Sequence, residues 1–94
     1  MDLQTLRGEI DHIDSQLITL LARRMEIVEQ IAEYKYERGL PVLNRDREAV
    51  VIAQVRERAG TDLADDTQAF FEHLMRLSRE RQEALILRKR EQAI

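Results

Sequence analysis

The sequence lacks cysteine and has only one proline, three glycines and 4% aromatic residues among its 94 residues. The absence of cysteine excludes disulfide bonds and thiolate metal sites. The shortage of proline, glycine and aromatic residues argues against a β-sheet protein, which needs proline and glycine in its turns and bulky residues in its strands. No apolar run approaches the roughly 18 residues that span a bilayer. The first twenty residues carry five charged side chains, which argues against a signal peptide. We therefore expect a cytoplasmic, soluble protein with no membrane partner.

The chain also lacks a strong charge of either sign. It has 15 Lys and Arg against 18 Asp and Glu, a net charge of -3. Nucleic-acid binders usually carry a basic excess, so we expect no nucleic-acid partner. His12 and His73 are isolated, and neither a glycine-rich phosphate loop nor a Ser-His-Asp set is evident. The sequence predicts neither a metal site nor a cofactor.

Long helices are what the composition favours. Ala, Glu, Lys, Leu and Arg make up 47 of the 94 residues, a share typical of coiled coils and helical proteins. The length suits one domain over residues 1–94. We expect an all-α fold with three helices per chain, one long and two shorter.

Helix boundaries follow from the apolar spacing and the terminal signals. Apolar residues three and four apart predict a first helix over about 3–38, which Gly39 and Pro41 end. Asn44 is a good N-cap for a second helix that closes at Gly60. Asp62 or Asp65 is expected to cap the third helix, since Asp65 and the Gln three residues later resemble a capping box. The third helix continues to the basic segment 87–90.

The first helix is too long for a compact domain of this size. About 36 residues extend about 54 Å at 1.5 Å per residue, whereas a compact domain of 94 residues is roughly 30 Å across. The helix must project with its apolar stripe uncovered. A second copy of the chain is the simplest cover, so we expect a homodimer built on this helix.

Polar side chains interrupt the apolar stripes at four positions. Arg24 and Lys35 fall on the face of the first helix that Leu20, Ile27 and Ile31 are expected to bury. Ser78 and Gln82 interrupt the stripe of the third helix in the same way. An unpaired buried cation costs several kcal/mol. The four groups therefore either pair with one another and with acids, or line a cavity that holds an anion.

Three other charged residues are compatible with either internal pairing or an anion-binding cavity. Glu48 could pair with Arg24 or Lys35, which would make the polar positions purely structural. Arg47, close to Asp46 and Glu48, reads in isolation as an ordinary salt-bridged charge at a helix start. Arg7 lies roughly 25 Å from Arg24 along one helix, so it could reach the same small molecule only from another chain.

These residues together resemble a known family. Their order resembles that of the small all-helical chorismate mutases over nearly the whole chain, in the motifs Leu6-Arg7, Arg23-Arg24, Lys35, Pro41-Val42, Asp46-Arg47-Glu48 and Ser78-x-x-x-Gln82. The resemblance implies an intertwined homodimer with two identical sites. It also implies the rearrangement of chorismate to prephenate in phenylalanine and tyrosine biosynthesis. This pericyclic reaction needs no nucleophile, general base or cofactor.

The resemblance also implies a role for each polar position. Arg24 and the partner's Arg7 would clamp the carboxylate on the enolpyruvyl side of chorismate. Lys35 and Gln82 would donate hydrogen bonds to the ether oxygen, where negative charge grows in the transition state. Lys35, Gln82 and Arg24 are thus the expected catalytic residues.

Four residues at the starts and middles of the later helices complete the expected site. Arg47 and Ser78 would hold the rest of the substrate dianion, and Glu48 would accept a hydrogen bond from the ring hydroxyl. Asn44 stands where some relatives have an acid near that hydroxyl, so it would contribute through its backbone.

Other functions remain open at this point. An isochorismate-pyruvate lyase of the same fold would need similar carboxylate clamps and a lysine at the ether oxygen. The connection between Lys35 and Asn44, which would cover the site, is expected to decide between the two reactions. A non-enzymatic helical dimerisation module would pair its polar core positions internally. Docking to another pathway enzyme is compatible with each reading.

Overall fold

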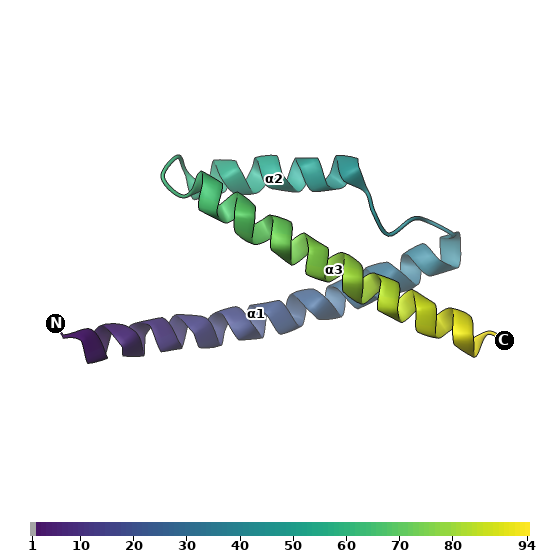
Figure 1. Cartoon of the computed structure of the whole chain (residues 1–94), viewed down its shortest axis with the longest axis horizontal. Coiled ribbons are helices and arrows are strands. Elements are labelled where there is room, and N and C mark those ends of the chain that lie inside the picture. Colours follow the sequence, from purple (N-terminus) through teal and green to yellow (C-terminus); the bar gives the residue numbers. More distant parts are fainter. Residues whose placement is uncertain (1) are drawn as a thin grey trace.

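The computed structural model describes residues 2–94 and contains three helices: α1 (Leu3–Arg38), α2 (Arg45–Ala59) and α3 (Ala64–Gln92). No strand occurs among these residues. Figure 1 shows α3 running diagonally between the other two helices. The predicted all-α class and the predicted order of one long and two shorter helices are confirmed.

Local capping signals set the ends of α1. The Asp2 carboxylate accepts a hydrogen bond from the Thr5 N–H at 2.8 Å and so satisfies one of the unpaired donors of the first turn. Gly39 ends the helix in the left-handed conformation, with φ of 64°. The Leu40 N–H then donates to the Lys35 carbonyl at 2.9 Å. The predicted end of the helix is confirmed, and the turn at Gly39 begins the connection to α2.

The predicted start of α2 is confirmed, whereas that of α3 is wrong. Asn44 caps α2 by accepting from the Arg47 N–H at 3.0 Å. At the start of α3 the N-cap position is Leu63, and no side chain caps the helix.

The side chains of the expected capping box contact a neighbouring helix. Asp65 lies in the first turn of α3, and Asp62 precedes the helix. The Arg56 guanidinium near the end of α2 donates to Asp65 at 2.9 Å and to Gln68 at 2.7 Å. Both side chains of the expected box are therefore engaged by α2, and this contact ties the two helices together beside their connection.

The core lies where α3 crosses the second half of α1. Ala32 is completely buried and packs with Leu85 and Ile86, and the partly buried Tyr36 and Val42 lie against this cluster. A small residue at the crossing lets the two helices approach closely. The other half of α3 packs along α2 (Figure 1).

The face of α1 that α3 covers differs from the predicted one. Val28 and Ala32 are the buried residues of α1. Leu20, Ile27 and Ile31, which were expected to be buried, are 66%, 37% and 42% exposed. Neighbouring helix positions differ by about 100° in direction, so α3 packs on a face rotated from the main apolar stripe. That prediction is wrong for the single chain, and the stripe itself is left uncovered.

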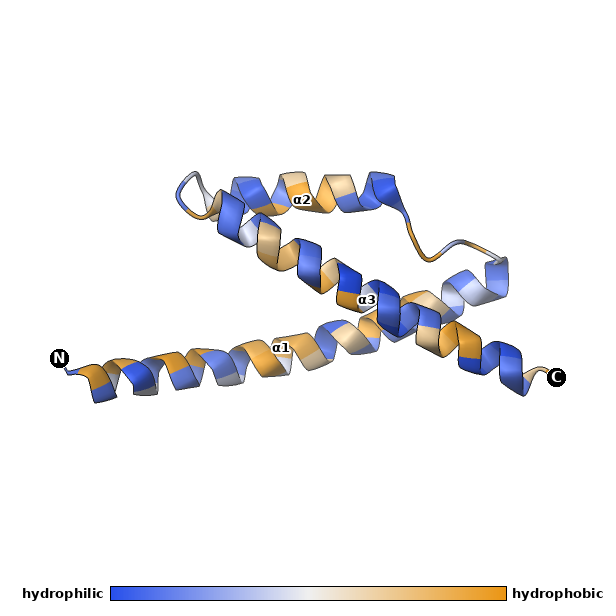
Figure 2. Cartoon of the chain, in the orientation of Figure 1, coloured by the Kyte–Doolittle hydropathy of each residue, from blue (hydrophilic) through white to orange (hydrophobic). Residues whose placement is uncertain are grey.

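The first half of α1 projects beyond the rest of the molecule. Every residue from 2 to 23 is exposed. The radius of gyration is 17.0 Å and the molecule measures 60 × 27 × 14 Å, against a radius of about 12 Å for a compact chain of this length. Figure 2 shows apolar residues recurring along this projecting helix. The predicted projection of α1 is confirmed.

Among residues 2–94, no helix combines the length and apolar character needed to cross a bilayer.

Candidate active site

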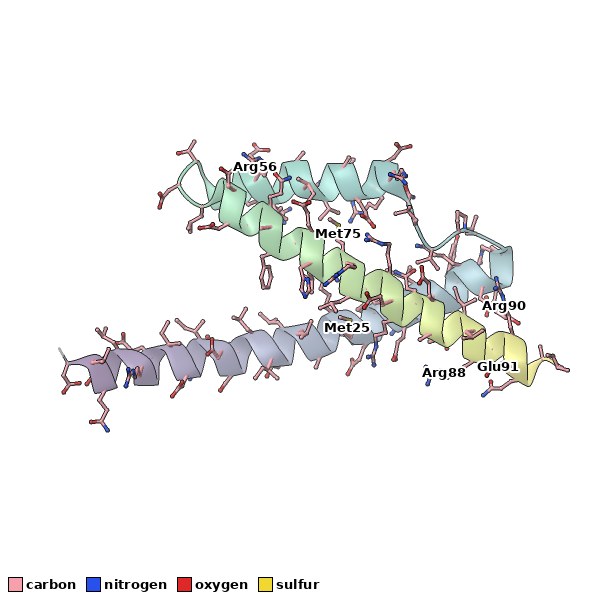
Figure 3. The ribbon with its side chains drawn as sticks, in the orientation of Figure 1. Met25, Arg56, Met75, Arg88, Arg90 and Glu91 are labelled. Carbon is pink, nitrogen blue, oxygen red and sulfur yellow. The ribbon has the colours of Figure 1, made fainter. Side chains whose placement is uncertain are left out.

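A cavity of about 260 Å³ lies between the second half of α1, the start of α2 and the middle of α3. Met75, labelled in Figure 3, lies on its α3 side. Seven of the eight predicted site residues line this cavity: Arg24, Lys35, Asn44, Arg47, Glu48, Ser78 and Gln82. The structure thus brings together residues that lie up to 58 positions apart in the sequence.

Arg24 is held against α3 by a hydroxyl group. Its guanidinium donates to the Ser78 hydroxyl, which in turn donates to the Leu74 carbonyl at 2.8 Å. Burial lowers the pKa of Arg24 from its ordinary value, although an arginine remains protonated at physiological pH. Within residues 2–94 no carboxylate pairs with Arg24. The arrangement leaves a positioned, partly desolvated cation at one wall of the cavity.

Lys35 joins three parts of the chain. From α1, its Nζ donates to the Val42 carbonyl at 2.7 Å and to the Gln82 Oε1 at 3.1 Å. An ammonium group has three N–H donors, so one remains for a ligand, and the Gln82 amide keeps its own two. Burial lowers the pKa of Lys35, and the nearby Glu48 carboxylate partly opposes that shift. Lys35 and Gln82 therefore present N–H donors next to each other in the cavity.

The partner of Glu48 is a residue that the structural interpretation did not include. Glu48 could have paired with Arg24 or Lys35, but the Arg79 Nη1 donates to its two oxygens at 2.7 and 2.6 Å. Arg79 also lines the cavity and was not among the site residues predicted from the sequence. Its position directly after Ser78 and three residues before Gln82 was the feature of the sequence that could have indicated a place near the cavity.

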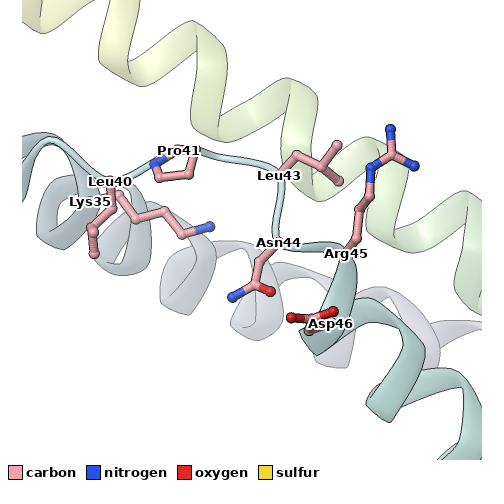
Figure 4. A pocket seen from close by; sticks show the side chains of 7 residues that line it. All are labelled: Lys35, Leu40, Pro41, Leu43, Asn44, Arg45 and Asp46. Carbon is pink, nitrogen blue, oxygen red and sulfur yellow. The ribbon is translucent and has the colours of Figure 1, made fainter.

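Asn44 and Arg47 lie at the rim formed by the start of α2. The Asn44 side-chain oxygen is already used as the cap of α2. A wider hollow of about 430 Å³ opens beside it, along the connection between α1 and α2. Figure 4 shows Lys35 extending along this connection, with Asn44 and Asp46 at the start of the next helix. Lys35 and Asn44 line both spaces, so the connection borders the cavity.

Arg7 is the one predicted site residue outside the cavity. It lies in the exposed, projecting part of α1. Along the helix it is roughly 25 Å from Arg24, too far for both to contact one small molecule within a chain.

The charge of the cavity suits an anionic ligand. Its lining holds the four cations Arg24, Lys35, Arg47 and Arg79 and a single carboxylate, Glu48. Among residues 2–94 no group of three His, Asp or Glu side chains could hold a metal ion. Aligned hydrogen-bond donors in a partly dry cavity stabilise developing negative charge effectively. The fold and the cavity define an all-helical protein with a preformed, mainly cationic cavity between its three helices.

Comparison with known families agrees with this class. The chorismate mutase type II family matches residues 6–83, which include all eight predicted site residues. The chain belongs to this family, and the resemblance inferred from the motifs is confirmed.

Individual relatives are similar over part of the chain. The T-protein of Haemophilus influenzae is 41% identical over 69 residues, covering 68% of this chain and 18% of the relative. The 4-amino-4-deoxychorismate mutase of Streptomyces venezuelae is 34% identical, covering 68% and 58%. The chorismate mutase of Methanocaldococcus jannaschii is 31% identical, covering 58% and 56%. The chain thus spans less than a fifth of the T-protein and more than half of the other two. No solved structure matches it significantly.

Proposed function

We propose that this chain is an isomerase that converts chorismate to prephenate. One observation carries the proposal: the Lys35 ammonium and the Gln82 amide are hydrogen-bonded to each other in a cationic cavity. Family membership supports the same reaction. In this Claisen rearrangement the ether C–O bond breaks as a new C–C bond forms, and no proton is transferred. The protein needs only to hold the reactive conformer and stabilise the separating charge.

Carboxylate binding falls to the arginines and the serine. Arg24 would clamp the enolpyruvyl carboxylate, and the Ser78 hydroxyl already fixes its guanidinium. Arg47 would hold the rest of the dianion from α2, and Ser78 would join it from α3 by turning its one O–H from the Leu74 carbonyl toward the ligand. Because these groups are positioned before the ligand arrives, little ordering is needed on binding.

Charge stabilisation falls to Lys35 and Gln82. Both would donate to the ether oxygen as negative charge grows there, and this interaction strengthens in the transition state. Gln82 is neutral, so its contribution does not depend on pH near neutrality. Glu48 would accept from the ring hydroxyl, with the Asn44 backbone nearby. The reaction as written uses no cofactor and no metal ion.

A second copy of the chain would complete the site. The projecting half of α1 exposes apolar residues that a partner would cover, among them Leu3, Leu6, Ile10, Ile13 and Leu17. In such an intertwined homodimer the partner's Arg7 would enter the cavity beside Arg24. Residues 1–94 would then act as one cytoplasmic, mutase-like helical domain, alone or beside another pathway enzyme.

Product analysis tests the proposed reaction. The purified chain is incubated with chorismate and, in parallel, with isochorismate, and products are identified by chromatography. Prephenate formed far above the uncatalysed rate supports the proposal, and Arg24→Ala should abolish it. Arg58→Ala is the matched control, since Arg58 is exposed on α2 and does not line the cavity.

Two other outcomes would overturn the proposal. Pyruvate released mainly from isochorismate would assign the lyase reaction. Neither product from a folded protein would indicate a non-enzymatic dimerisation module.

A further inference from the structure

Arg79 is the one charged residue of the cavity to which the proposed reaction gives no role. Its Nη1 contacts both oxygens of Glu48 at 2.7 and 2.6 Å. Both side chains are 27% exposed, so the ion pair is partly shielded from water. A short, partly buried ion pair of this kind fixes both side chains far better than a surface pair would.

The positions on α3 explain why Arg79 faces a different wall from its neighbours. Ser78 and Gln82 are four residues apart, and both bond to side chains of α1. Arg79 is rotated by about 100° from Ser78 and bonds to Glu48 of α2. The cavity therefore has an α1 wall that carries Arg24 and Lys35 and an α2 wall that carries the Arg79–Glu48 pair.

We propose that Arg79 is a specificity-determining positioning residue, which holds Glu48 so that the α2 wall accepts a ring hydroxyl and rejects a ring ammonium. This inference rests on the proposed function, in which Glu48 receives the hydroxyl of the substrate ring. The group on the substrate ring, a hydroxyl or an ammonium, is then the feature by which the protein distinguishes the two classes of substrate.

Electrostatics gives the reason for the selectivity. A carboxylate alone would attract an ammonium group, but the guanidinium neutralises Glu48 and lies within hydrogen-bond distance of both its oxygens. An incoming ammonium would therefore meet a like charge. A hydroxyl carries no charge and needs only one lone pair, and a carboxylate has about four, of which Arg79 uses two. Like-charge exclusion is a standard way to reject a close analogue.

The decisive quantity is the ratio of kcat/KM for chorismate to kcat/KM for its 4-amino-4-deoxy analogue, whose amine is protonated near neutral pH. The wild-type protein should prefer chorismate. Arg79→Gln should shift the ratio toward the amino analogue by about tenfold or more, because the like charge is removed. Arg79→Lys keeps the cation and should retain most of the preference.

Two controls separate selectivity from folding. Arg76→Gln makes the same chemical change one turn earlier on α3, where the side chain is exposed and outside the cavity, and should leave the ratio unchanged. Glu48→Gln removes the anion and keeps Arg79, so it should increase the preference for chorismate. This variant tests the idea even where Arg79→Gln does not fold.

The outcomes also separate this inference from the proposed function. Turnover of chorismate with equal losses on both substrates in Arg79→Gln would overturn the selectivity role and leave the mutase assignment standing. An unchanged ratio of the two kcat/KM values in Glu48→Gln would also overturn the selectivity role and leave the mutase assignment standing. No turnover of either substrate by the wild-type protein would overturn the proposed function and this inference with it.

Discussion

Lys35 links α1 to the connection that follows it and to α3. It lies one turn before the end of α1, and its ammonium is fixed by the Val42 carbonyl and by Gln82 of α3. These two contacts orient a cation that a flexible four-carbon side chain would otherwise leave mobile. The position of the ammonium therefore depends on how the connection after α1 is folded.

The pKa of Lys35 predicts how the proposed activity depends on pH. Burial lowers this pKa below the ordinary value of 10.5. Below its pKa the ammonium is present and can stabilise the ether oxygen, and above it the neutral amine cannot. We expect kcat/KM, which reports groups of the ligand-free protein, to fall as pH rises through a value below 10.5, measured as a pH profile with chorismate.

Two variants check the origin of that alkaline loss. Lys35→Ala should be slower by about a hundredfold to a thousandfold, the usual cost of removing a preorganised donor, and should lack the alkaline fall. Lys89→Ala is the control, because the other lysine of the chain lies outside the cavity. An alkaline fall that persists unchanged in Lys35→Ala would show that another group causes it.

Arg79 marks the limit of what residue types alone can predict. Arg24, Lys35, Ser78 and Gln82 were recognisable because they interrupt apolar stripes whose period is visible in the sequence. Arg79 interrupts no stripe, and its partner is 31 positions away on another helix. Only the packing of α2 against α3 brings that pair together.

At the level of elements, helix ends that depend on local signals were predictable and those that depend on packing were not. Gly39 and Asn44 act on backbone groups within a few residues, and both ends are as expected. The cap of α3 was predicted wrongly, since the helix begins at Ala64 and Asp65 lies inside its first turn, where it pairs with Arg56 of α2. The buried face of α1 was also predicted wrongly, because the placement of α3 decides which residues of α1 are covered.

The glycines give a matched test of the turn that positions Lys35. A methyl group added at Gly39 or Gly8 would meet no atom within 4 Å, but Gly39 has φ of 64°. Gly39→Ala should lower the free energy of unfolding by about 1 kcal/mol, because only glycine adopts this conformation without strain. Gly8→Ala, inside α1, should raise it by about 1 kcal/mol. Urea denaturation at fixed protein concentration measures both.

The two substitutions differ in backbone conformation and not in available space. Equal effects of the same sign would therefore contradict the role assigned to the left-handed turn. Gly39→Ala should also reduce the proposed activity, since the turn carries the Val42 carbonyl that holds Lys35.

At the scale of the whole molecule, the length of α1 gives the chain its elongated shape. A single chain of 60 × 27 × 14 Å leaves 22 consecutive exposed residues, 2–23, at one end of this helix. The sequence predicted this projection from length alone, because a helix of fixed rise cannot fit within a compact domain of 94 residues. How two such helices would pair depends on contacts between chains, which the sequence pattern does not specify.

A mutase site shared between two copies of this chain can be tested by mixing two inactive variants. Arg7→Ala and Arg24→Ala are each expected to lose activity, since each removes one arginine from both sites. When the two are unfolded and refolded together in equal amounts, about half of the dimers are mixed, and each has one intact site of two. A shared site should therefore restore roughly a quarter of the wild-type rate of prephenate formation. No recovery, or full activity in Arg7→Ala alone, would contradict it.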